Sequence, residues 1–347
     1  MEQKVEQNSS IFSFRNFRTP LIIVSTFILL EIIFRVYNFG AHTALNWYKH
    51  NPQGILLTDL AMGVEDPEIS WKLRPNMQEV LKTQKFTTNS QGFRNPEFKL
   101  EKEEGTTRIT CLGRSITMGS GVQDEEVFTQ VLQERFNSQG PDSIEIINCG
   151  VGGYSFKQML DYYEVYVAPL DPDIVIIPIS PKDLANGMYR TPLPLSAAKT
   201  SLTNLKYYLS FTFTYNVMKT IVKRATENFM SVDWKYRMAD KENQDTVPMT
   251  SEPMLAAFIE KRAEEGVKCY FFSPDRHAGK RVHDTTPIQT FLDGYESAEY
   301  LAIEDFLVEN MPENRYLYFS DTHPSPAMHA ALAEALYVNL KARLVYN

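Results

Sequence analysis

Three polar residues that could act together in nucleophilic catalysis follow two apolar runs of the sequence. Ser115 stands after the run RITCLG, in the segment GRSITMGSG, and Asp321 and His323 stand after the run RYLYFS, in the segment DTHPS. A serine hydroxyl attacks a carbonyl carbon only when a base takes its proton, and a histidine oriented by a carboxylate is such a base. These residues therefore predict acyl transfer, with Ser115 as nucleophile, His323 as base and Asp321 as the orienting carboxylate. A helix-capping serine and a structural loop histidine are the competing interpretations.

The negative charge that develops on a carbonyl oxygen in such a reaction needs hydrogen-bond donors at fixed positions. The backbone N–H groups of Ser115 and Gly153 are candidates, because Gly153 closes the glycine-rich segment NCGVGG after another apolar run, and glycine permits close approach. Lys182 and Asp183 follow a further run, DIVIIPIS, and a lysine ammonium can also donate to an oxyanion. We therefore expect Gly153, Lys182 and Asp183 to lie in the substrate site.

Two basic residues, Arg114 and Lys182, stand among these candidate site residues. Arg114 precedes the serine and Lys182 follows the run DIVIIPIS, so both should flank one cleft if the two runs are neighbouring strands. An ion pair from Arg114 to Asp183 or Asp321 would close that cleft. An anion such as a phosphate or a uronate carboxylate could instead bind between Arg114 and Lys182.

The elements that must position these residues alternate along the chain. Short apolar runs predict strands buried on both faces of a parallel sheet, at 108–113, 144–150, 173–180, 267–274 and 315–320. Segments with apolar residues at spacings of three and four predict helices between them, at 124–136, 155–167, 252–266 and 326–344. Alternating strands and helices predict an α/β fold with a doubly wound parallel sheet, whose ligands bind at the carboxyl ends of the strands.

The N-terminal region has the composition of a membrane anchor. Residues 19–40 are apolar for most of about 20 positions, the length of one bilayer crossing, and no convincing signal-peptide cleavage site follows. The basic residues Lys4, Arg15 and Arg18 come first, so the positive-inside rule puts residues 1–18 in the cytoplasm.

Within the predicted span, Glu31 and Arg35 share a helix face and can pair. Two interpretations are open: both side chains snorkel toward the outer interface, or they meet polar groups on another transmembrane helix. Because Glu31 is the deeper residue and has the shorter side chain, we expect it to pack against a transmembrane protein partner.

Composition limits the classes of function. The chain of 347 residues carries a net charge of −8 and no broad basic face, which argues against nucleic acid as a partner. Its three cysteines, Cys111, Cys149 and Cys269, lack the spacing of metal ligands and lie in or beside apolar runs. We therefore expect buried thiols, no disulfide framework and no metal site.

The segments GRSITMGSG, NCGVGG and DTHPS, with the upstream TTNSQGFRNPEF, resemble the SGNH (GDSL-type) hydrolase superfamily over residues 85–345. The resemblance implies a flavodoxin-like three-layer αβα sandwich and hydrolysis or transfer of acyl groups, often acetyl esters on carbohydrates, without metal or organic cofactor. The chain departs from the family pattern in three ways. Arg114 replaces an aspartate, Lys182 stands where an asparagine donates to the oxyanion, and Asp321 and His323 are two residues apart rather than three.

Together these features predict a serine esterase or O-acyltransferase anchored in a bacterial inner membrane, with its main domain periplasmic or otherwise extracytoplasmic. Its substrate would be an acylated carbohydrate or lipid of the cell envelope. An inactive SGNH-like scaffold subunit of a membrane complex is the second hypothesis, and an anion-binding module is the third. The expected organisation begins with a cytoplasmic N-terminus at 1–18 and an anchor at 19–40. A linker and lead-in follow at 41–107, and then an SGNH-like domain at 108–347, which contains a helical insertion at about 190–250.

Overall fold

The structure is a computed structural model of the chain. It describes residues 14–41, 60–66, 68–82, 84–139, 143–186, 209, 212–229, 251–274, 284–318 and 321–344. Most of the predicted cytoplasmic segment, part of the predicted linker and most of the predicted insertion lie outside the described residues.

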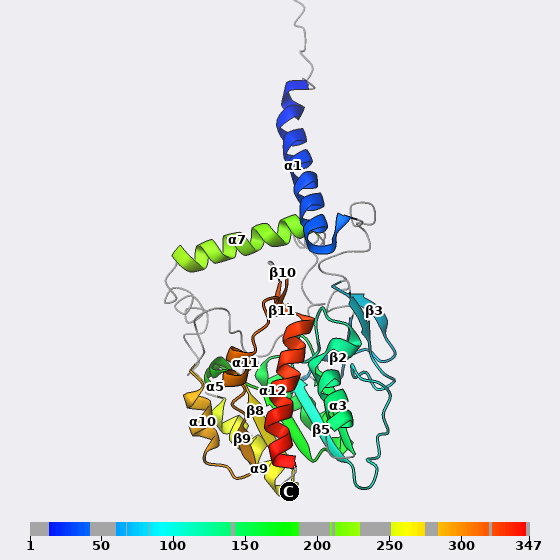
Figure 1. Cartoon of the computed structure of the whole chain (residues 1–347), viewed down its shortest axis with the longest axis vertical. Coiled ribbons are helices and arrows are strands. Elements are labelled where there is room, and N and C mark those ends of the chain that lie inside the picture. Colours follow the sequence, from blue (N-terminus) through cyan, green and yellow to red (C-terminus); the bar gives the residue numbers. More distant parts are fainter. Residues whose placement is uncertain are drawn as a thin grey trace, which may run out of the picture.

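A parallel five-stranded sheet forms the centre of the main domain (Figure 1). Its strands are β5 (Thr107–Gly113), β6 (Ile144–Gly150), β7 (Ile174–Pro178), β8 (Lys268–Phe272) and β9 (Ala298–Tyr300). Their spatial order is β6-β5-β7-β8-β9, the flavodoxin-like order in which the chain reverses direction beside the first strand. The predicted α/β sandwich with a central parallel sheet is therefore confirmed.

One predicted strand does not belong to this sheet. The run at 315–320 instead forms β10 (Tyr316–Tyr318), which pairs antiparallel with β11 (Asp321–Pro324) in a separate hairpin. The fifth sheet position belongs to β9, which pairs with β8. Because β9 has only three residues and its middle residue is exposed, it lacks the continuous apolar run by which the buried strands were predicted.

Helices cover both faces of the sheet. On one face lie α3 (Phe128–Gln139), α11 (Glu304–Glu309) and α12 (Pro326–Leu344), and on the other lie α4 (Phe156–Tyr162), α9 (Glu252–Glu264) and α10 (Thr286–Leu292). Side chains of β5 alternate between the two cores, with Ile109 and Cys111 toward α12 and Leu112 toward α4. The three cysteines are free and buried, as expected. Shorter helical segments are η3 (Asp124–Glu126), η4 (Tyr163–Val167), η5 (Ala168–Leu170) and α5 (Pro181–Asn186).

The segment expected to be a linker and lead-in contributes two hairpins to the domain. The first joins β1 (Ala61–Gly63) to β2 (Trp71–Leu73), and the second joins β3 (Gln78–Leu81) to β4 (Gln84–Thr87). Trp71 and Phe86 are fully buried in the core on the α4 side. Strands of three or four residues are too short to show a clear periodicity, so the sequence did not reveal them.

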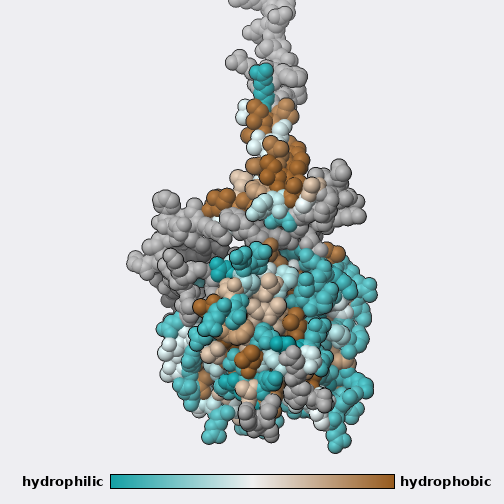
Figure 2. Space-filling model, viewed as in Figure 1, coloured by the Kyte–Doolittle hydropathy of each residue, from teal (hydrophilic) through white to brown (hydrophobic). Residues whose placement is uncertain are grey.

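Two helices stand apart from the sandwich. α1 (Phe14–Phe39) projects from the domain, and α7 (Phe213–Phe229) runs crosswise to α1, beside the end of α1 that is nearest the domain (Figure 1). The part of α1 from Arg18 to Asn38 is long and apolar enough to cross a membrane. Most of its apolar side chains are exposed, and Figure 2 shows them as a brown column above a largely hydrophilic domain.

Candidate active site

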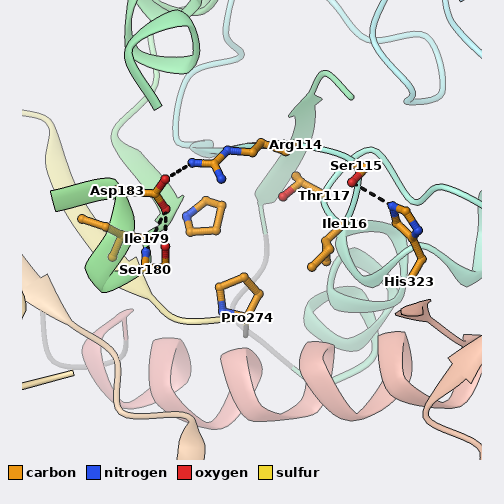
Figure 3. A pocket seen from close by; sticks show the side chains of 10 residues that line it. Arg114, Ser115, Ile116, Thr117, Ile179, Ser180, Asp183, Pro274 and His323 are labelled. Atoms are coloured by element: carbon orange, nitrogen blue, oxygen red, sulfur yellow. Dashed lines mark hydrogen bonds and ion pairs between the residues drawn. The ribbon is translucent and has the colours of Figure 1, made fainter. Parts of the chain in front are cut away.

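Ser115, His323 and Asp321 meet at the carboxyl end of the sheet. His323 Nε2 lies 2.9 Å from Ser115 Oγ, and His323 Nδ1 lies 2.6 Å from Asp321 Oδ1. Ser115 follows β5, while the other two residues belong to the β10–β11 hairpin, so segments 208 residues apart in sequence supply the contact. Figure 3 shows the serine hydroxyl and the imidazole pointing toward one another. The three side chains form a continuous chain of hydrogen bonds.

The turn after β5 that carries Ser115, called the serine turn below, lies close to the sheet because two strands end in glycine. A Cβ on Gly113, whose φ is +154°, would overlap the Thr117 hydroxyl, and a Cβ on Gly150 would overlap the backbone at Met118. Thr117 closes the turn, because its hydroxyl donates to Leu112 O at 3.2 Å. The turn after β5 therefore folds back tightly enough to present Ser115 at the end of the sheet.

Asp321 fixes the histidine through two contacts. Its Oδ1 accepts the His323 backbone N–H at 3.0 Å as well as facing the ring at Nδ1. Such a turn around an aspartate side chain holds the backbone two residues onward, which suits the spacing of two found here. The shorter spacing is thus compatible with a carboxylate that orients the imidazole.

A residue that the sequence did not reveal, Lys82, completes this cluster. Lys82 is buried in the turn between β3 and β4, and its Nζ lies 2.6 Å from Asp321 Oδ2 and 3.0 Å from His323 Nδ1. Burial alone would raise the pKa of Asp321, but hydrogen bonds and charges from His323 and Lys82 outweigh it and hold that pKa well below its usual value. Burial in turn lowers the pKa of Lys82, while Asp321 opposes that change.

The charge of Asp321 decides the tautomer of the histidine. An ionised carboxylate can only accept a hydrogen bond, so the Asp321 contact of 2.6 Å favours the tautomer with a proton on His323 Nδ1, while the Lys82 ammonium 3.0 Å from the same nitrogen opposes it. The other ring nitrogen, Nε2, then carries the lone pair that faces Ser115 Oγ. This is the arrangement in which the imidazole can take the serine proton.

We expect Lys82→Met to destabilise the fold by about 3–5 kcal/mol at neutral pH, because it leaves the largely buried Asp321 carboxylate without its cation. The lowered pKa of Asp321 means that its ionised form stabilises the protein above the unfolded value of 3.8, and that this stabilisation is lost as the pH falls through the folded value. The cost of Lys82→Met should therefore shrink on acidification.

Urea unfolding of the variant across pH measures this cost. The double variant Lys82→Met/Asp321→Asn removes both charges and should recover part of the stability. A single variant as stable as the parent at every pH would contradict this account of the cluster.

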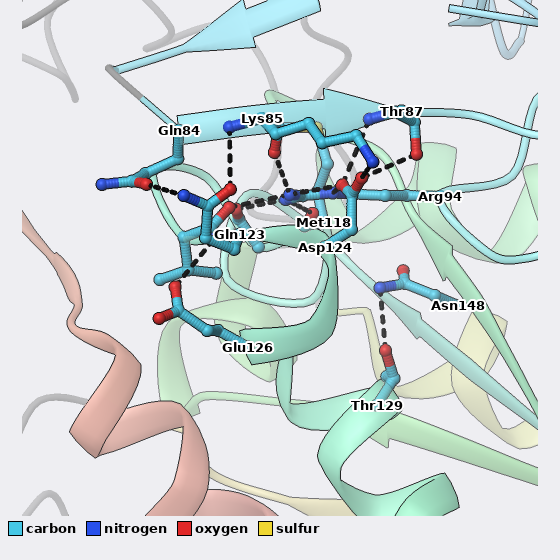
Figure 4. A network of polar contacts seen from close by, with 12 residues as sticks. Gln84, Lys85, Thr87, Arg94, Met118, Gln123, Asp124, Glu126, Thr129 and Asn148 are labelled. Carbon is cyan, nitrogen blue, oxygen red and sulfur yellow. Dashed lines mark hydrogen bonds and ion pairs between the residues drawn. The ribbon is translucent and has the colours of Figure 1, made fainter. Parts of the chain in front are cut away.

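A second missed residue, Arg94, holds the serine turn against the lead-in hairpin (Figure 4). Its Nη1 donates to Met118 O at 2.8 Å and to Gly119 O, and its Nη2 donates to Val122 O at 2.8 Å. Its Nε donates to Asp124 Oδ1 at 3.0 Å. The buried guanidinium thus satisfies several carbonyl groups of the loop that follows Ser115 and fixes the position of that loop.

Asp124 and Asn148 extend the same network. Asp124 accepts the backbone N–H of Thr87 at 3.1 Å and its hydroxyl at 2.7 Å, so the hairpin carrying Lys82 is held to the loop carrying Ser115. Asn148, at the end of β6, donates to Thr117 O at 2.7 Å. Two neighbouring segments therefore support the serine turn.

A pocket of about 180 Å³ opens beside Ser115. An ion pair between Arg114 and Asp183 lies along it, and Asp183 also accepts the Ser180 backbone N–H at 3.0 Å and its hydroxyl at 2.7 Å. Arg114 is one-third exposed and Asp183 is buried. The lining residues are Arg114, Ser115, Ile116, Thr117, Pro178, Ile179, Ser180, Asp183, Pro274 and His323.

The structure does not bring Lys182 into this pocket. Lys182 is exposed in the first turn of α5 and is absent from the pocket lining, so the prediction that Arg114 and Lys182 flank one cleft differs from the observed arrangement. The reason is that neighbouring residues of a helix point in different directions, and here Asp183 takes the inward one. Gly153 is exposed after β6, with φ +87°, and is likewise not among the residues that line the pocket.

The second histidine of this region has a structural role. His329 is buried on α12, its Nδ1 accepts the Phe128 backbone N–H at 3.2 Å, and burial lowers its pKa to about 3. Within the described part of the chain, no group of three or more His, Cys, Asp or Glu side chains is placed to hold a metal ion.

Comparison with known proteins gives similarity in structure but not in sequence. A scan against protein-family models finds no match, and a search of curated proteins finds none either. Among solved structures, the psychrotrophic esterase EstA from Pseudoalteromonas sp. is 15% identical, covers 69% of this chain and 99% of its own, and gives a TM-score of 0.39. A lipase/acylhydrolase from Enterococcus faecalis is 14% identical, with 69% and 97% covered and a TM-score of 0.42. The acetyl xylan esterase AlAXEase is 16% identical, with 67% and 98% covered and a TM-score of 0.37.

These three similarities have TM-scores below 0.5. The expected resemblance to the SGNH hydrolases therefore rests on the sequence motifs. The similarity concerns the fold, and the chemistry of the site rests on the side-chain geometry described above.

Proposed function

We propose that the chain is a serine esterase or O-acyltransferase that uses Ser115 as nucleophile, His323 as base and Asp321 as the orienting carboxylate. The observation that carries the proposal is the contact of 2.9 Å between His323 Nε2 and Ser115 Oγ, with Asp321 2.6 Å from the other ring nitrogen. A nucleophile within hydrogen-bond reach of a base, which a third group orients, is the arrangement that acyl transfer requires.

In the first half-reaction, Ser115 Oγ attacks the ester carbonyl carbon while its proton passes to His323 Nε2. The carbonyl oxygen becomes an oxyanion, for which the Ser115 backbone N–H is a donor that has no acceptor among the described residues. We propose Gly153 N–H as a second donor once substrate is bound. Collapse of the tetrahedral intermediate expels the alcohol, which takes the proton from Nε2 and leaves the acyl group on Ser115.

In the second half-reaction, water or an acceptor hydroxyl attacks the acyl-serine. His323 Nε2 takes the proton of the attacking group and returns it to Ser115 Oγ as the acyl group leaves. Water as acceptor gives hydrolysis, and a carbohydrate hydroxyl gives O-acyl transfer.

The pocket favours a short acyl group. Its volume is about 180 Å³, and Pro178, Ile179 and Pro274 supply apolar walls. We propose that an acetyl group occupies this space and that a longer chain meets the Arg114–Asp183 pair, which lines the pocket. We therefore propose short acyl esters, such as those on cell-envelope carbohydrate or lipid, as the substrate class.

Hydrolysis of a series of nitrophenyl esters by the full chain tests this proposal. We expect kcat/KM to fall by about tenfold or more from acetyl to octanoyl, because overfilling a packed pocket costs roughly 1–3 kcal/mol. Lys182→Ala is the matched control, since Lys182 is a cation beside the pocket that does not line it; it should change kcat/KM less than about threefold, against 10²–10³ for loss of an oxyanion donor. No hydrolysis of any ester, or a preference for long chains, would count against the proposal.

We further propose that α1 anchors the protein in a bacterial inner membrane, with the N-terminus cytoplasmic and the main domain periplasmic or otherwise extracytoplasmic. The length and apolar composition of α1 support the anchor, and the basic residues that precede it support this orientation.

One observation favours a second candidate, an inactive SGNH-like scaffold. The Arg114–Asp183 ion pair occupies one side of the pocket and neutralises both groups in the absence of substrate. Two arrangements weigh against the scaffold: the serine and the imidazole remain in contact, and both line the open pocket. The ester assay separates the two candidates directly. An anion-binding module has less support, since Arg114 is paired and Lys182 lies outside the pocket lining.

A further inference from the structure

A carboxylate of α1 caps the N-terminus of α7. Glu31 accepts the Phe213 backbone N–H at 3.1 Å, and it accepts the Thr214 backbone N–H at 2.9 Å and hydroxyl at 3.0 Å. Arg35 donates to Glu31 at 2.8 Å, and its guanidinium lies 5.6 Å from the centre of the Phe213 ring. An anion at a helix N-terminus satisfies otherwise unpaired N–H groups and interacts favourably with the helix dipole. The start of α7 is therefore fixed to the side of α1.

The position of Glu31 sets the depth of α7 along the candidate span. Glu31 precedes Asn38, the end of the candidate span, by seven residues, or about 10 Å at 1.5 Å per residue. Helices that lie in a membrane interface bury their apolar face about 5–10 Å into the boundary between headgroups and acyl chains. Because α7 runs crosswise to α1 (Figure 1), it would lie in the plane of a bilayer that α1 crosses, near this boundary.

The exposed side chains of α7 suit that position. Met218, Ile221 and Val222 are 56%, 53% and 60% exposed, and they fall within an arc of about 100° on a helix of 3.6 residues per turn. Thr220 lies outside this arc, on the more polar side of the helix. Figure 2 shows apolar surface beside the base of α1, on the side of the molecule toward which α1 projects.

The composition of α7 agrees with a lipid surface. Its sequence, FTYNVMKTIVKRATENF, holds three basic residues and one acidic residue. Interfacial helices combine an apolar face with lysine and arginine, which favour anionic headgroups.

We propose that α7 lies in the membrane interface and is a second contact with the bilayer that α1 crosses, with Met218, Ile221 and Val222 entering the lipid. This inference rests on the proposed anchoring by α1. It also orients the catalytic domain, since β10 and β11 lie at the end of the domain nearest α7 (Figure 1). The side of the domain that carries Asp321 and His323 would then face the membrane surface.

Fluorescence quenching by brominated lipids tests the inference in the full chain. Single cysteines at Met218, Ile221, Val222 and Thr220, and at Ile28 on α1, are labelled with an environment-sensitive fluorophore. The native cysteines are buried and so are protected from labelling in the folded protein. Each labelled protein is reconstituted into vesicles of phosphatidylcholine and phosphatidylglycerol that carry bromine on the acyl chains.

We expect strong quenching at Ile28, and quenching at Met218, Ile221 and Val222 at least about threefold greater than at Thr220, because only the apolar face reaches the acyl chains. Quenching at Ile28 with uniformly weak quenching at the four α7 positions would overturn the inference while leaving the anchor in place; water or another protein would then cover this face. The absence of quenching at Ile28 would overturn both the anchor and the inference.

Discussion

Replacing Ser115 by alanine is expected to lower kcat for acetyl ester hydrolysis by at least about 10⁴-fold, because it removes the atom that forms the acyl intermediate. His323 and Asp321 keep their mutual contact of 2.6 Å without the serine, so the fold and the pocket should persist. The measurement is the steady-state rate of full-length protein in detergent, with thermal unfolding to confirm that the variant is folded.

Ser138→Ala is a matched control, since Ser138 is an exposed serine on α3 that hydrogen-bonds only locally, to Arg135 O at 3.1 Å. It should retain the parent rate. If Ser115→Ala and Ser138→Ala hydrolyse the ester equally fast, the observed turnover does not come from the proposed nucleophile.

Asp321→Asn is expected to lower kcat by about 10⁴-fold while largely preserving the shape of the site. The asparagine amide can donate to His323 Nδ1, which places the proton on Nε2 and removes the lone pair that faces Ser115. Lys82 would also lose its anionic partner at 2.6 Å, so a decrease in stability should accompany the loss of rate.

Asp161→Asn provides a carboxylate control. Asp161 pairs with Lys157 on α4 and takes no part in the pocket. We expect its kcat to stay within about threefold of the parent, in line with the small effect of a surface ion pair. A loss of less than tenfold in Asp321→Asn would show that Asp321 does not control the tautomer of the base.

The fold was predictable where strands are long and apolar. The runs that became β5 to β8 are buried on both faces, and such runs carry the signal of a parallel sheet in composition alone. The strand β9 was not predicted, because three residues of which one is exposed show no hydrophobic pattern. The hairpins of the lead-in segment were not predicted either. Their stability comes from the packing of Trp71 and Phe86 against the rest of the domain rather than from local sequence.

The site was predictable where residues directly follow strands. Ser115 obeys the rule that ligands bind at the carboxyl ends of parallel strands, and the β10–β11 hairpin brings Asp321 and His323 to the same place. Lys82 and Arg94 reach the site from the lead-in segment through tertiary packing, which no local spacing encodes. A lysine in a hairpin turn is ordinarily exposed, so nothing in the sequence marked Lys82 as buried.

The expectation that Glu31 meets a transmembrane protein partner rests on its charge alone. A carboxylate within a predicted span requires compensation, and the sequence offered only Arg35 nearby. The structure supplies the N-terminus of α7 as well, 182 residues onward in the chain. The Glu31 carboxylate therefore has partners within the chain, and its charge does not by itself call for another membrane protein.

The reactivity of Ser115 toward a fluorophosphonate probe tests the central claim most directly. The probe phosphorus forms a bond to a serine oxygen only when a base removes the hydroxyl proton, so labelling reports activation of the nucleophile without reference to the natural substrate. We predict that mass spectrometry of the folded, full-length protein finds one adduct, located on Ser115, and none in Ser115→Ala. Folded protein that remains unlabelled, or a label that persists in Ser115→Ala, would contradict the proposed catalytic role of Ser115.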